Sequence, residues 1–419
     1  MAEADIAAPA GAPAKGRKAA VAFILVNVVL DTLSLGIIVP VLPGLIQAFQ
    51  HGDAAAAART IGLFSTVWAF MQFVCAPILG ALSDRFGRRP VLLGSLTGLG
   101  LDYLLMAMAP SLPWLFAGRV ISGMTAAGGA TANAYIADVT PPEKRAATFG
   151  YIGAAWGLGF VAGPTLGGVL GQVDLRLPFW AAMGLTLVAA FWGLFVLPES
   201  LPSERRAAFA WSRANPVGSL SLLRSHPDLL GLAGVNFLFQ IAHYVLPTVF
   251  VLYAANRYGW TPMITGPALA LTGVCNIIVQ MLLVKPIVAK IGERGAVLAG
   301  LGFGAAGFLI YAFAPNGWLF LVGTPVFGLI GLFGPGYQGL ITRRVKPDEQ
   351  GRLQGANSAL MGIAGMIGPG LFTLTYAWFI TKSAIPVPGS AFILAALLMV
   401  FAVLLALFVA RRAGEAVSF

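Results

Sequence analysis

The sequence predicts an all-α membrane protein in which twelve transmembrane helices form two pseudo-symmetric six-helix bundles. Three observations lead to this fold class: the composition, the number of long apolar runs, and an internal repeat. Hydrophobic residues make up 58% of the 419 residues and charged residues only 10%, whereas soluble domains contain about 25% charged residues. This chain therefore has too few polar side chains to cover a water-facing surface, while a bilayer solvates apolar faces directly.

Twelve apolar runs are long enough to cross a bilayer, which takes about 20 helical residues for roughly 30 Å of hydrocarbon. The first six runs occupy residues 20–46, 61–82, 90–110, 113–139, 146–171 and 178–197. The second six occupy residues 229–253, 262–291, 295–314, 317–341, 353–380 and 389–410. Because the first run is too long for a signal-peptide core, we interpret it as the first transmembrane helix.

Polar segments divide the chain into two halves. Residues 1–18 are rich in Ala, Pro and Gly and are expected to form a disordered tail, and residues 412–419 a second tail. Residues 198–228 are rich in Pro, Ser and charge, which predicts a linker between an N-terminal bundle (19–197) and a C-terminal bundle (229–411). With an even number of spans, both termini lie on one side of the bilayer. Of the 26 Lys and Arg residues, twenty fall in segments on that side and four in segments on the opposite side. The positive-inside rule therefore places both termini in the cytoplasm.

The two halves repeat when 205 is added to the residue number. Eight Gly and Pro positions match without a gap, from Gly118 with Gly323 to Pro164 with Pro369. A parallel repeat of this kind predicts a pseudo-two-fold axis along the membrane normal, with a small-molecule site between the halves near the middle of the bilayer.

Several function classes are disfavoured. The net charge of +10 is spread over short clusters between apolar runs and forms no single basic face for nucleic acid. The sequence has no phosphate-binding loop, no metal-ligand cluster and no nucleophile–base pair. We therefore expect neither an enzyme nor a bound cofactor. Cys75 and Cys275 lie inside apolar runs and are interpreted as small buried residues.

Three of the ionisable residues inside predicted spans are candidates for function: Asp31 in helix 1, Asp102 in helix 3 and Arg119 in helix 4. A charge in the middle of a bilayer costs at least ~2.5–3.5 kcal/mol, so such residues usually face a cavity and serve a function. Burial and a neighbouring arginine act on a carboxyl group in opposite directions, which suits reversible proton binding near neutral pH. We expect these three residues to couple transport to protons, and a static buried ion-pair network is the alternative.

Polar side chains also recur at helical spacing on otherwise apolar spans. The candidates for a substrate cavity are Asn27 and Ser34, which flank Asp31 on helix 1, together with Trp68, Gln72, Asn236, Gln240, His243, Asn276 and Gln280. Positions i, i+4 and i+7 share one helix face. The alternative is hydrogen bonding between helices, and for His243 a satisfied buried histidine.

Residues 80–90 form a short loop, Gly-Ala-Leu-Ser-Asp-Arg-Phe-Gly-Arg-Arg-Pro, between helices 2 and 3. Its Asp84, Arg85, Gly87 and Arg88, with Asp138 at the inner end of helix 4, form a candidate conformational switch that latches the cytoplasmic side. The alternative is that the loop carries only topology signals and turn residues.

Helix 5 carries glycines at i, i+4 and i+8, namely Gly159, Gly163 and Gly167, with Pro164 and Gly168 beside them. Small residues allow two helices to pack backbone to backbone. We expect this motif to pack tightly and to seal one end of a pathway.

These motifs resemble those of the major facilitator superfamily. The 80–90 loop is similar to its signature between helices 2 and 3, and the Gly159–Gly168 pattern is similar to the antiporter motif of drug:proton exporters. The strings at 31–43, 101–105 and 249–260 resemble bacterial tetracycline efflux antiporters. The resemblance implies a multi-pass inner-membrane antiporter that exports amphipathic drug-like compounds by alternating access, with tetracycline as a candidate. A monomer is the default expectation. It implies no cofactor beyond the proton gradient, although Mg²⁺ could accompany a chelating substrate.

Two positions depart from that family. Gly304 stands where the tetracycline exporters have an acidic residue in helix 9, and Asn276 stands where they have a histidine in helix 8. The second half therefore has no carboxylate in its spans, and proton coupling falls to Asp31 and Asp102. Three other functions stay open: a proton symporter for a metabolite, a passive facilitator, and a membrane receptor that transports nothing.

Overall fold

The computed structural model describes residues 14–125, 128–140, 142–207, 215, 218–225, 227–346, 349–383 and 387–412. Helices account for nearly all of these residues, and no β-strand occurs among them. The prediction of an all-α fold is therefore confirmed.

The first half of the chain contains eight helical segments. They are α1 (Ala14–Ile38), α2 (Leu42–Phe49), α3 (Ala54–Phe86), α4 (Arg88–Met108), α5 (Leu112–Thr125), α6 (Gly128–Val139), α7 (Pro142–Val173) and α8 (Leu177–Val196). Asp53 caps α3 because its carboxylate accepts hydrogen bonds from the amides of Ala55 (2.9 Å) and Ala56 (3.0 Å). The prediction of a loop over residues 80–90 is wrong, because α3 continues to Phe86 and α4 begins at Arg88. Only Gly87 separates the two helices, and its φ of 106° is one that glycine adopts without strain.

Short helices occupy the described part of the linker, and longer ones follow. The linker contains η1 (Ser203–Arg205), η2 (Gly218–Leu220) and α9 (Ser221–Ser225). The second half contains α10 (Pro227–His243), α11 (Val245–Tyr258), α12 (Pro262–Ile278), the π-helical η3 (Val279–Leu283), α13 (Val284–Phe313), α14 (Gly317–Gly328), the 3₁₀ segment η4 (Leu329–Leu332), α15 (Phe333–Thr342), α16 (Gln350–Thr381) and α17 (Ser390–Arg412).

Ten helical stretches are long and apolar enough to cross a membrane, which makes the chain a multi-pass membrane protein. Two features account for the difference from the twelve expected spans. The expected 113–139 span falls on α5 and α6, and residues 126–127 between them lie outside the described residues. The expected 262–291 and 295–314 spans fall in one stretch, Pro262–Phe313, whose backbone is non-helical at Gly292 (φ 70°).

Contacts related by 205 residues recur in the two halves. Arg119 Nη2 of α5 lies 3.7 Å from Met106 Sδ of α4. The positions 205 residues later, Thr324 and Tyr311, meet through a hydrogen bond of 3.2 Å between their hydroxyl groups. The repeat seen in the sequence is therefore also a repeat of packing.

The first apolar helix of each half is interrupted at matching positions. Helix α1 ends at Ile38 and α10 ends at His243, and these residues are 205 apart. Each helix resumes after a short interruption, α1 as α2 and α10 as α11.

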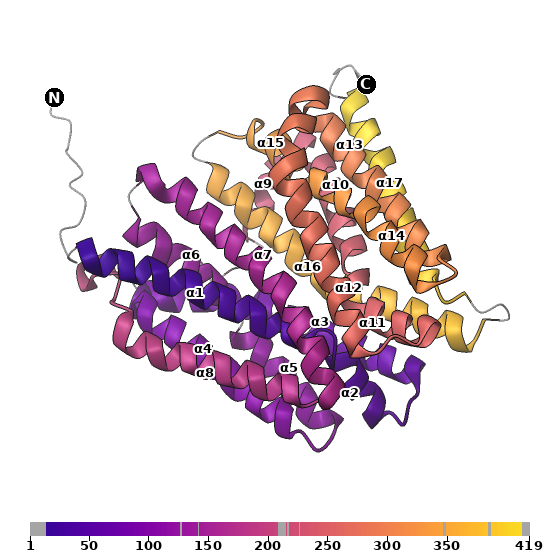
Figure 1. The fold of residues 1–419 in the computed structure, drawn as a ribbon. Helices are drawn as coiled ribbons and strands as arrows, with labels where there is room; N and C mark the ends of the chain where they lie inside the picture. Colours follow the sequence, from indigo (N-terminus) through magenta and orange to yellow (C-terminus); the bar gives the residue numbers. More distant parts are fainter. Residues whose placement is uncertain are drawn as a thin grey trace.

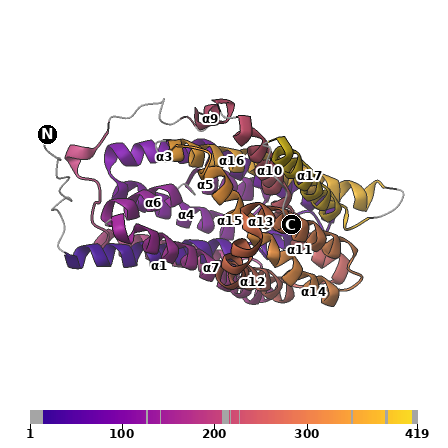
Figure 2. The ribbon, with the colours of Figure 1, turned by 90° about the horizontal axis from the view of Figure 1, so that it is seen from above.

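Figure 1 shows α1–α8 and α10–α17 as two groups, which diverge toward the start of α1 and the end of α17. The groups meet along two helix pairs, α3 with α16 and α7 with α12. Figure 2 shows these pairs on opposite sides of the molecule. Because the 205-residue shift carries α3 onto α12 and α7 onto α16, each pair is the repeat of the other.

The groups are packed most closely at the end opposite the linker, which we call the far end. Thr66 Oγ1 of α3 donates a hydrogen bond to the Met366 carbonyl of α16 (3.0 Å). An added Cβ on Gly168 of α7 would touch the Pro262 carbonyl of α12. Toward the other end, which we call the linker end, α3, α7 and α16 carry Gly80, Gly153 and Gly351, around which an added Cβ would meet no atom within 4 Å.

A large aromatic cluster forms the core of the second half near the far end. Tyr311 and Phe320 stack with ring centroids 4.0 Å apart, and Phe392 and Tyr253 pack beside them. The Tyr253 hydroxyl group donates to the Tyr311 carbonyl (2.7 Å). This packing holds α11, α13, α14 and α17 together.

Candidate functional site

Helices α4 and α5 bring Asp102 and Arg119 together inside the first half. Arg119 Nη2 lies 3.9 Å from Asp102 Oδ2, and the side chains are 10% and 0% exposed. Neither carboxylate oxygen, nor Arg119 Nε, has a hydrogen-bond partner among the described residues. An added Cβ on Gly118 would lie 2.7 Å from Asp102 Oδ1, so α5 packs directly against this carboxyl group. The pair is buried, close and incompletely bonded.

Asp31 is half-buried and lies in α1, seven residues before that helix ends at Ile38. Tyr103, which is fully buried on α4, lies within electrostatic reach of both Asp31 and Asp102. Asn27 is buried one turn before Asp31, and its Oδ1 has no partner in the described chain. Asp31 is thus the more accessible of the two carboxyl groups within the spans.

Ser34, the other polar residue predicted beside Asp31, contacts α8. It is fully buried, it donates to the Leu30 carbonyl (2.7 Å), and it accepts a hydrogen bond from Thr186 of α8 (3.3 Å). The structure therefore places Ser34 in the contact between α1 and α8, where it reaches no accessible space.

Trp68 and Gln72 are half-buried on α3. An added Cβ on Gly123 of α5 would lie 2.6 Å from the Trp68 carbonyl, so α3 and α5 approach closely here. The indole Nε1 is buried and has no hydrogen-bond partner among the residues described. Trp68 is therefore a donor that the protein itself leaves unused.

The polar candidates of the second half differ in exposure. Asn236 is buried and Gln240 half-buried on α10, whereas His243 is exposed at the end of that helix. Asn276 of α12 and Gln280 of η3 are also exposed. Gln280 Nε2 donates to the Gly331 carbonyl of η4 (3.0 Å), which joins two irregular segments.

Aromatic rings from three helices form a stacked column beside these residues. Phe239 of α10 lies 3.9 Å from Phe333 of α15, centroid to centroid, at 14°. His243 continues the column at 5.9 Å from Phe239 and 6.4 Å from Phe327 of α14. Tyr337 extends it at the other end, 5.4 Å from Phe333. Helical spacing does not indicate this column, because its members come from segments about 90 residues apart in the chain.

The charged cluster lies at the linker end of the first half. Arg88 forms ion pairs with Asp84 and with Asp138 (Nε to Oδ2, 3.3 Å), and its Nη1 donates to Ser83 Oγ (2.7 Å). Arg85 is exposed and its guanidinium group lies over the Phe86 ring at 5.0 Å. All of these contacts stay within the first half.

Glu199 belongs to the same cluster, although the sequence marked it only as a linker charge. Its carboxylate accepts hydrogen bonds from the amides of Arg88 (2.8 Å) and Arg89 (3.3 Å), the first two residues of α4. It therefore caps a helix whose own N-cap residue, Gly87, has no side chain. An added Cβ on Gly87 would lie 2.7 Å from Glu199 Cδ, so a larger residue would displace the cap.

The glycines of α7 pack against two different helices. An added Cβ on Gly159 would lie 2.6 Å from Thr32 Cβ of α1, and one on Gly163 would lie 2.7 Å from Gly36 Cα. Gly167 also meets α1, at the Ile37 carbonyl, whereas Gly168 and the Pro164 carbonyl meet α12. The motif thus joins α1 to α7 and also joins the two halves at the far end.

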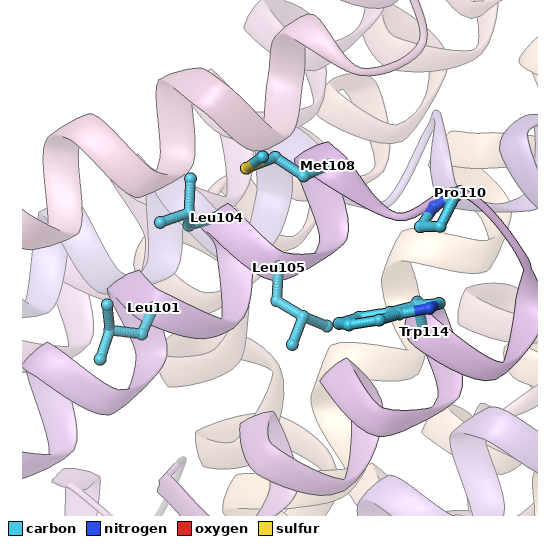
Figure 3. Close-up of a pocket in the computed structure, with 6 residues that line it drawn as sticks. All are labelled: Leu101, Leu104, Leu105, Met108, Pro110 and Trp114. Atoms are coloured by element: carbon cyan, nitrogen blue, oxygen red, sulfur yellow. The ribbon is translucent and has the colours of Figure 1, made fainter.

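A cavity of about 290 Å³ lies away from these residues, on the outer side of α4 and α5 (Figure 3). Its lining is entirely apolar: Leu101, Leu104, Leu105, Met108, Pro110 and Trp114. Leu101, Met108 and Trp114 are more than half exposed, so this face suits lipid chains. No group of three or more His, Cys, Asp or Glu residues that could hold a metal ion occurs in the described part of the chain.

Comparison with curated proteins gives strong matches along most of the chain. It is 40% identical over 357 residues to the class C tetracycline resistance protein of Escherichia coli, covering 84% of this chain and 89% of that protein. It is 37% identical to the class B protein of Escherichia coli, covering 84% and 87%. It is also 27% identical to multidrug resistance protein 2 of Bacillus subtilis, covering 83% and 86%.

Solved structures share the fold. A human organic anion transporter, TETRAN, matches with a TM-score of 0.69 at 23% identity, covering 94% of this chain and 100% of that one. The nucleoside transporter NupG matches with a TM-score of 0.76 at 12% identity, covering 93% and 98%. The model of the Major Facilitator Superfamily matches residues 24–369 and 277–418. The chain therefore belongs to the Major Facilitator Superfamily, a family of small-molecule transporters and not of enzymes.

Proposed function

We propose that this protein is a proton-coupled antiporter that exports small amphipathic compounds by alternating access, with tetracycline as a candidate substrate. The relatives that are 33–40% identical carry the name of tetracycline resistance proteins. Within that proposal, the chain has twelve spans in two six-helix bundles. The packing repeat supports this count, because the contact of Met106 with Arg119 returns as the contact of Tyr311 with Thr324.

The observation that carries the proposal is the state of the carboxyl groups in the spans. Asp102 is fully buried, its ion pair with Arg119 is long at 3.9 Å, and neither of its carboxylate oxygens accepts a hydrogen bond of standard geometry among the described residues. A carboxylate that served only a structural ion pair would be expected to have its oxygens satisfied. An unsatisfied buried carboxyl group is suited to binding a proton in one state and releasing it in another.

The end of the pathway that is closed identifies the state of the alternating-access cycle that this structure represents. The close contacts between the halves lie at the far end, while the linker end carries open glycine positions. If the linker end faces the cytoplasm, as the positive-inside rule requires, this conformation admits substrate from the cytoplasm. A proton arriving from outside at Asp31 or Asp102 then accompanies the return of the exporter.

The proton gradient supplies enough free energy for this work. A driving force of 150 mV corresponds to about 3.5 kcal/mol per charge, and that free energy sustains a substrate gradient of roughly a few hundred-fold. No cofactor is needed in this scheme, and Mg²⁺ would enter only as the companion of a chelating substrate. We further propose a monomer in the bacterial inner membrane, with both termini cytoplasmic.

The linker-end cluster has a proposed role in the conformational cycle. Arg88 is held by Asp84 and Asp138, and Asp84 stays 42% exposed in its side chain. Since the cluster forms no ion pair with the described second half, Asp84 is free to engage that half when the linker end closes. The cluster would then stabilise the opposite conformation, in which the far end opens.

Everted membrane vesicles with a fluorescent pH probe test the proposal. Addition of tetracycline to energised vesicles should release protons from the vesicle interior in the wild type. The Asp31→Asn variant should lose this release while its expression and thermal unfolding stay unchanged. Glu204→Gln, at an exposed linker carboxylate, is the matched control and should behave as the wild type.

Two outcomes would contradict the proposal. Tetracycline flux that only equilibrates the drug, ignores the proton gradient and survives Asp31→Asn would indicate a passive facilitator. Co-movement of substrate and protons in the same direction would indicate a symporter.

A further inference from the structure

Helix α12 passes into a π-helical turn, η3, in the middle of its apolar stretch. The Val284 amide donates to the Val279 carbonyl, which lies five residues earlier instead of the usual four. Pro286 follows, and it has no amide hydrogen to donate to the Leu282 carbonyl. A proline ring also crowds the carbonyl four residues before it, so an irregular turn at this point has a cause in the sequence. Such π-helical turns bend helices and are frequent at functional sites.

The chain between α14 and α15 is irregular at the same level. The 3₁₀ segment η4 lies there, and Pro335 follows it. Pro335 has no amide hydrogen for the carbonyl of Gly331, which is buried and lies four residues earlier. Gln280 of η3 supplies a donor instead, because its Nε2 lies 3.0 Å from that carbonyl oxygen. A buried carbonyl group needs such a partner, so Gln280 joins the two irregular segments.

The two segments that follow these irregular turns are joined a second time at the linker end. The first segment, residues 279–291, contains η3 and the start of α13, and the second segment, residues 333–342, is α15. Glu293 lies two residues past the first segment, and Arg343 directly follows the second. Arg343 Nη2 lies 2.9 Å from Glu293 Oε1. Because the two segments are connected at both of their ends, any bend at η3 must be accompanied by a bend at η4.

The second half separates from α7 at the level where η3 begins. An added Cβ on Gly157 of α7 would lie 3.3 Å from Ile277 Cδ1, near the end of α12. One turn closer to the linker end, an added Cβ on Gly153 would meet no atom within 4 Å. The packing of α7 on the second half thus follows α12 and loosens where the π-helical turn starts.

The other pair of helices between the halves, α3 and α16, shows the same relation. An added Cβ on Gly362 of α16 would lie 3.2 Å from Phe73 Cε2 of α3, whereas one on Gly80 would meet no atom within 4 Å. Pro77 has no amide hydrogen for the Phe73 carbonyl. Phe73 matches Ile278, the last residue of α12, in the 205-residue repeat. Different prolines therefore weaken α3 and α12 at matching positions, and the halves separate at both.

We propose that residues 279–291 and 333–342 form a gate at the linker end of the second half. The gate bends at η3 and η4 toward α7 when the linker end closes, and Gln280 is the positioning residue that couples the two bends. The inference rests on the proposed alternating access and deepens it, because closure then includes bending within one half. From Val279 to Ile291 the gate is about 18 Å long, so a bend of about 20° moves its tip by about 6 Å.

Distances between pairs of spin labels, measured in lipid nanodiscs with Cys75 and Cys275 replaced by serine, test the gate. One pair lies within the second half, at Lys290 near the tip of the gate and at Trp318 at the far end; both side chains are exposed. Rotation of rigid halves leaves this distance unchanged, whereas bending changes it by about 6 Å. The second pair, Gly153 with Lys290, reports the approach of the halves in either mechanism. Tetracycline and acidic pH are used to shift the population between the two states.

A proline variant tests whether bending limits transport. Pro286→Ala provides an amide hydrogen for the Leu282 carbonyl and should straighten η3. The unfolding temperature should stay the same or rise, because alanine favours a helix. The maximal rate of tetracycline transport in everted vesicles should nevertheless fall about tenfold, KM should change by less than about twofold, and the Lys290–Trp318 distance should stop changing. Pro267→Ala is the matched control, since Pro267 is an exposed proline on the far-end side of η3, and it should behave as the wild type.

A second variant tests the positioning role of Gln280. Gln280→Leu removes the donor to the Gly331 carbonyl, so the maximal rate should fall about fivefold while KM stays unchanged. A side chain that bound the substrate directly would raise KM instead. Gln280→Leu should also lower the unfolding temperature. Adding Pro335→Ala should restore that temperature, because alanine has an amide hydrogen that can donate to the same carbonyl.

The outcomes separate the gate from the exporter function. If tetracycline is transported while only the Gly153–Lys290 distance changes, the halves rotate as rigid bodies and the gate is refuted. A wild-type rate in Pro286→Ala also refutes the gate, and a raised KM in Gln280→Leu overturns the positioning role. If the wild type drives no proton-coupled flux of tetracycline, the exporter proposal fails, whereas a change in the Lys290–Trp318 distance would still establish bending within the second half.

Discussion

Removing one member of the Asp102–Arg119 pair should destabilise the first half much more than removing both. Arg119 is 8% exposed and lies 3.9 Å from the carboxylate, with Met106 Sδ as its other close neighbour. At that separation two unit charges attract by about 4 kcal/mol with an effective dielectric constant of 20. Breaking a buried pair typically costs about 3–5 kcal/mol, since the remaining charge stays uncompensated.

A double-mutant cycle measures this coupling. The variants are Asp102→Asn, Arg119→Gln and the double substitution, each purified in detergent and unfolded by heat and by denaturant. We expect each single variant to lose about 2–4 kcal/mol and the double variant to recover most of that loss. The double variant should still fail to couple transport to protons, because Asn cannot bind and release one.

Additive effects would refute this reasoning. If the double variant is as unstable as the sum of the two single variants, the charges do not interact and the ion pair is not part of the fold. If Asp102→Asn keeps full proton-coupled transport, Asp102 has no role in coupling and Asp31 alone must carry it.

Two more predictions follow from the packing. Glu199→Ala should lower the stability of α4 by about 1–2 kcal/mol, since the substitution removes a charged helix cap. Glu199→Gln should recover part of that stability. Thermal unfolding measures both variants, and an unchanged unfolding temperature in Glu199→Ala would exclude the capping role. An added Cβ on Gly62 lies 3.2 Å from Thr373 Cβ, close to the ~3.5–4.5 Å of a disulfide. Cysteines at both positions, with Cys75 and Cys275 replaced by serine, should therefore form a disulfide on oxidation. This disulfide should stop transport until it is reduced. Undiminished transport by the cross-linked protein would show that the far end need not open.

The long-range organisation of the fold could be predicted because it depends on simple periodic features. Apolar runs of sufficient length locate the helices, and the shift of 205 residues locates the repeat. The number of twelve spans stays a prediction, because two of the expected spans fall in one apolar stretch that turns at Gly292 and a third includes residues outside the described part of the chain.

The partners of individual side chains could not be predicted in the same way. Asn27, Asp31 and Ser34 share a helix face by spacing, yet Thr186 of α8 takes Ser34 out of that stripe. Glu199 caps a helix that begins 111 residues earlier, and no local pattern indicates such a contact. Helical spacing identifies a face of a helix, but it does not say which neighbouring helix covers each turn of that face.

The same limit explains why the second half was difficult to interpret. Spacing grouped Asn236, Gln240 and His243, but only His243 is exposed, and it is the residue at which the helix ends. The cause of the break is visible in the sequence as Pro247, four residues after His243. In this chain Pro247 therefore marks the end of α10, which helical spacing alone did not indicate.

The two halves share a packing contact but differ in the side chains that form it. Met106 and Arg119 in the first half occupy the same contact as Tyr311 and Thr324 in the second, yet only the first contact brings a charge beside a carboxyl group. The position that matches Asp102 is Gly307, where an added Cβ would lie 2.7 Å from Phe327 Cα, so close helix packing leaves no room for a carboxylate. In the proposed exporter this asymmetry assigns proton binding to the first half. A pseudo-symmetric scaffold can therefore move as two similar bodies while only one of them carries the buried carboxyl group.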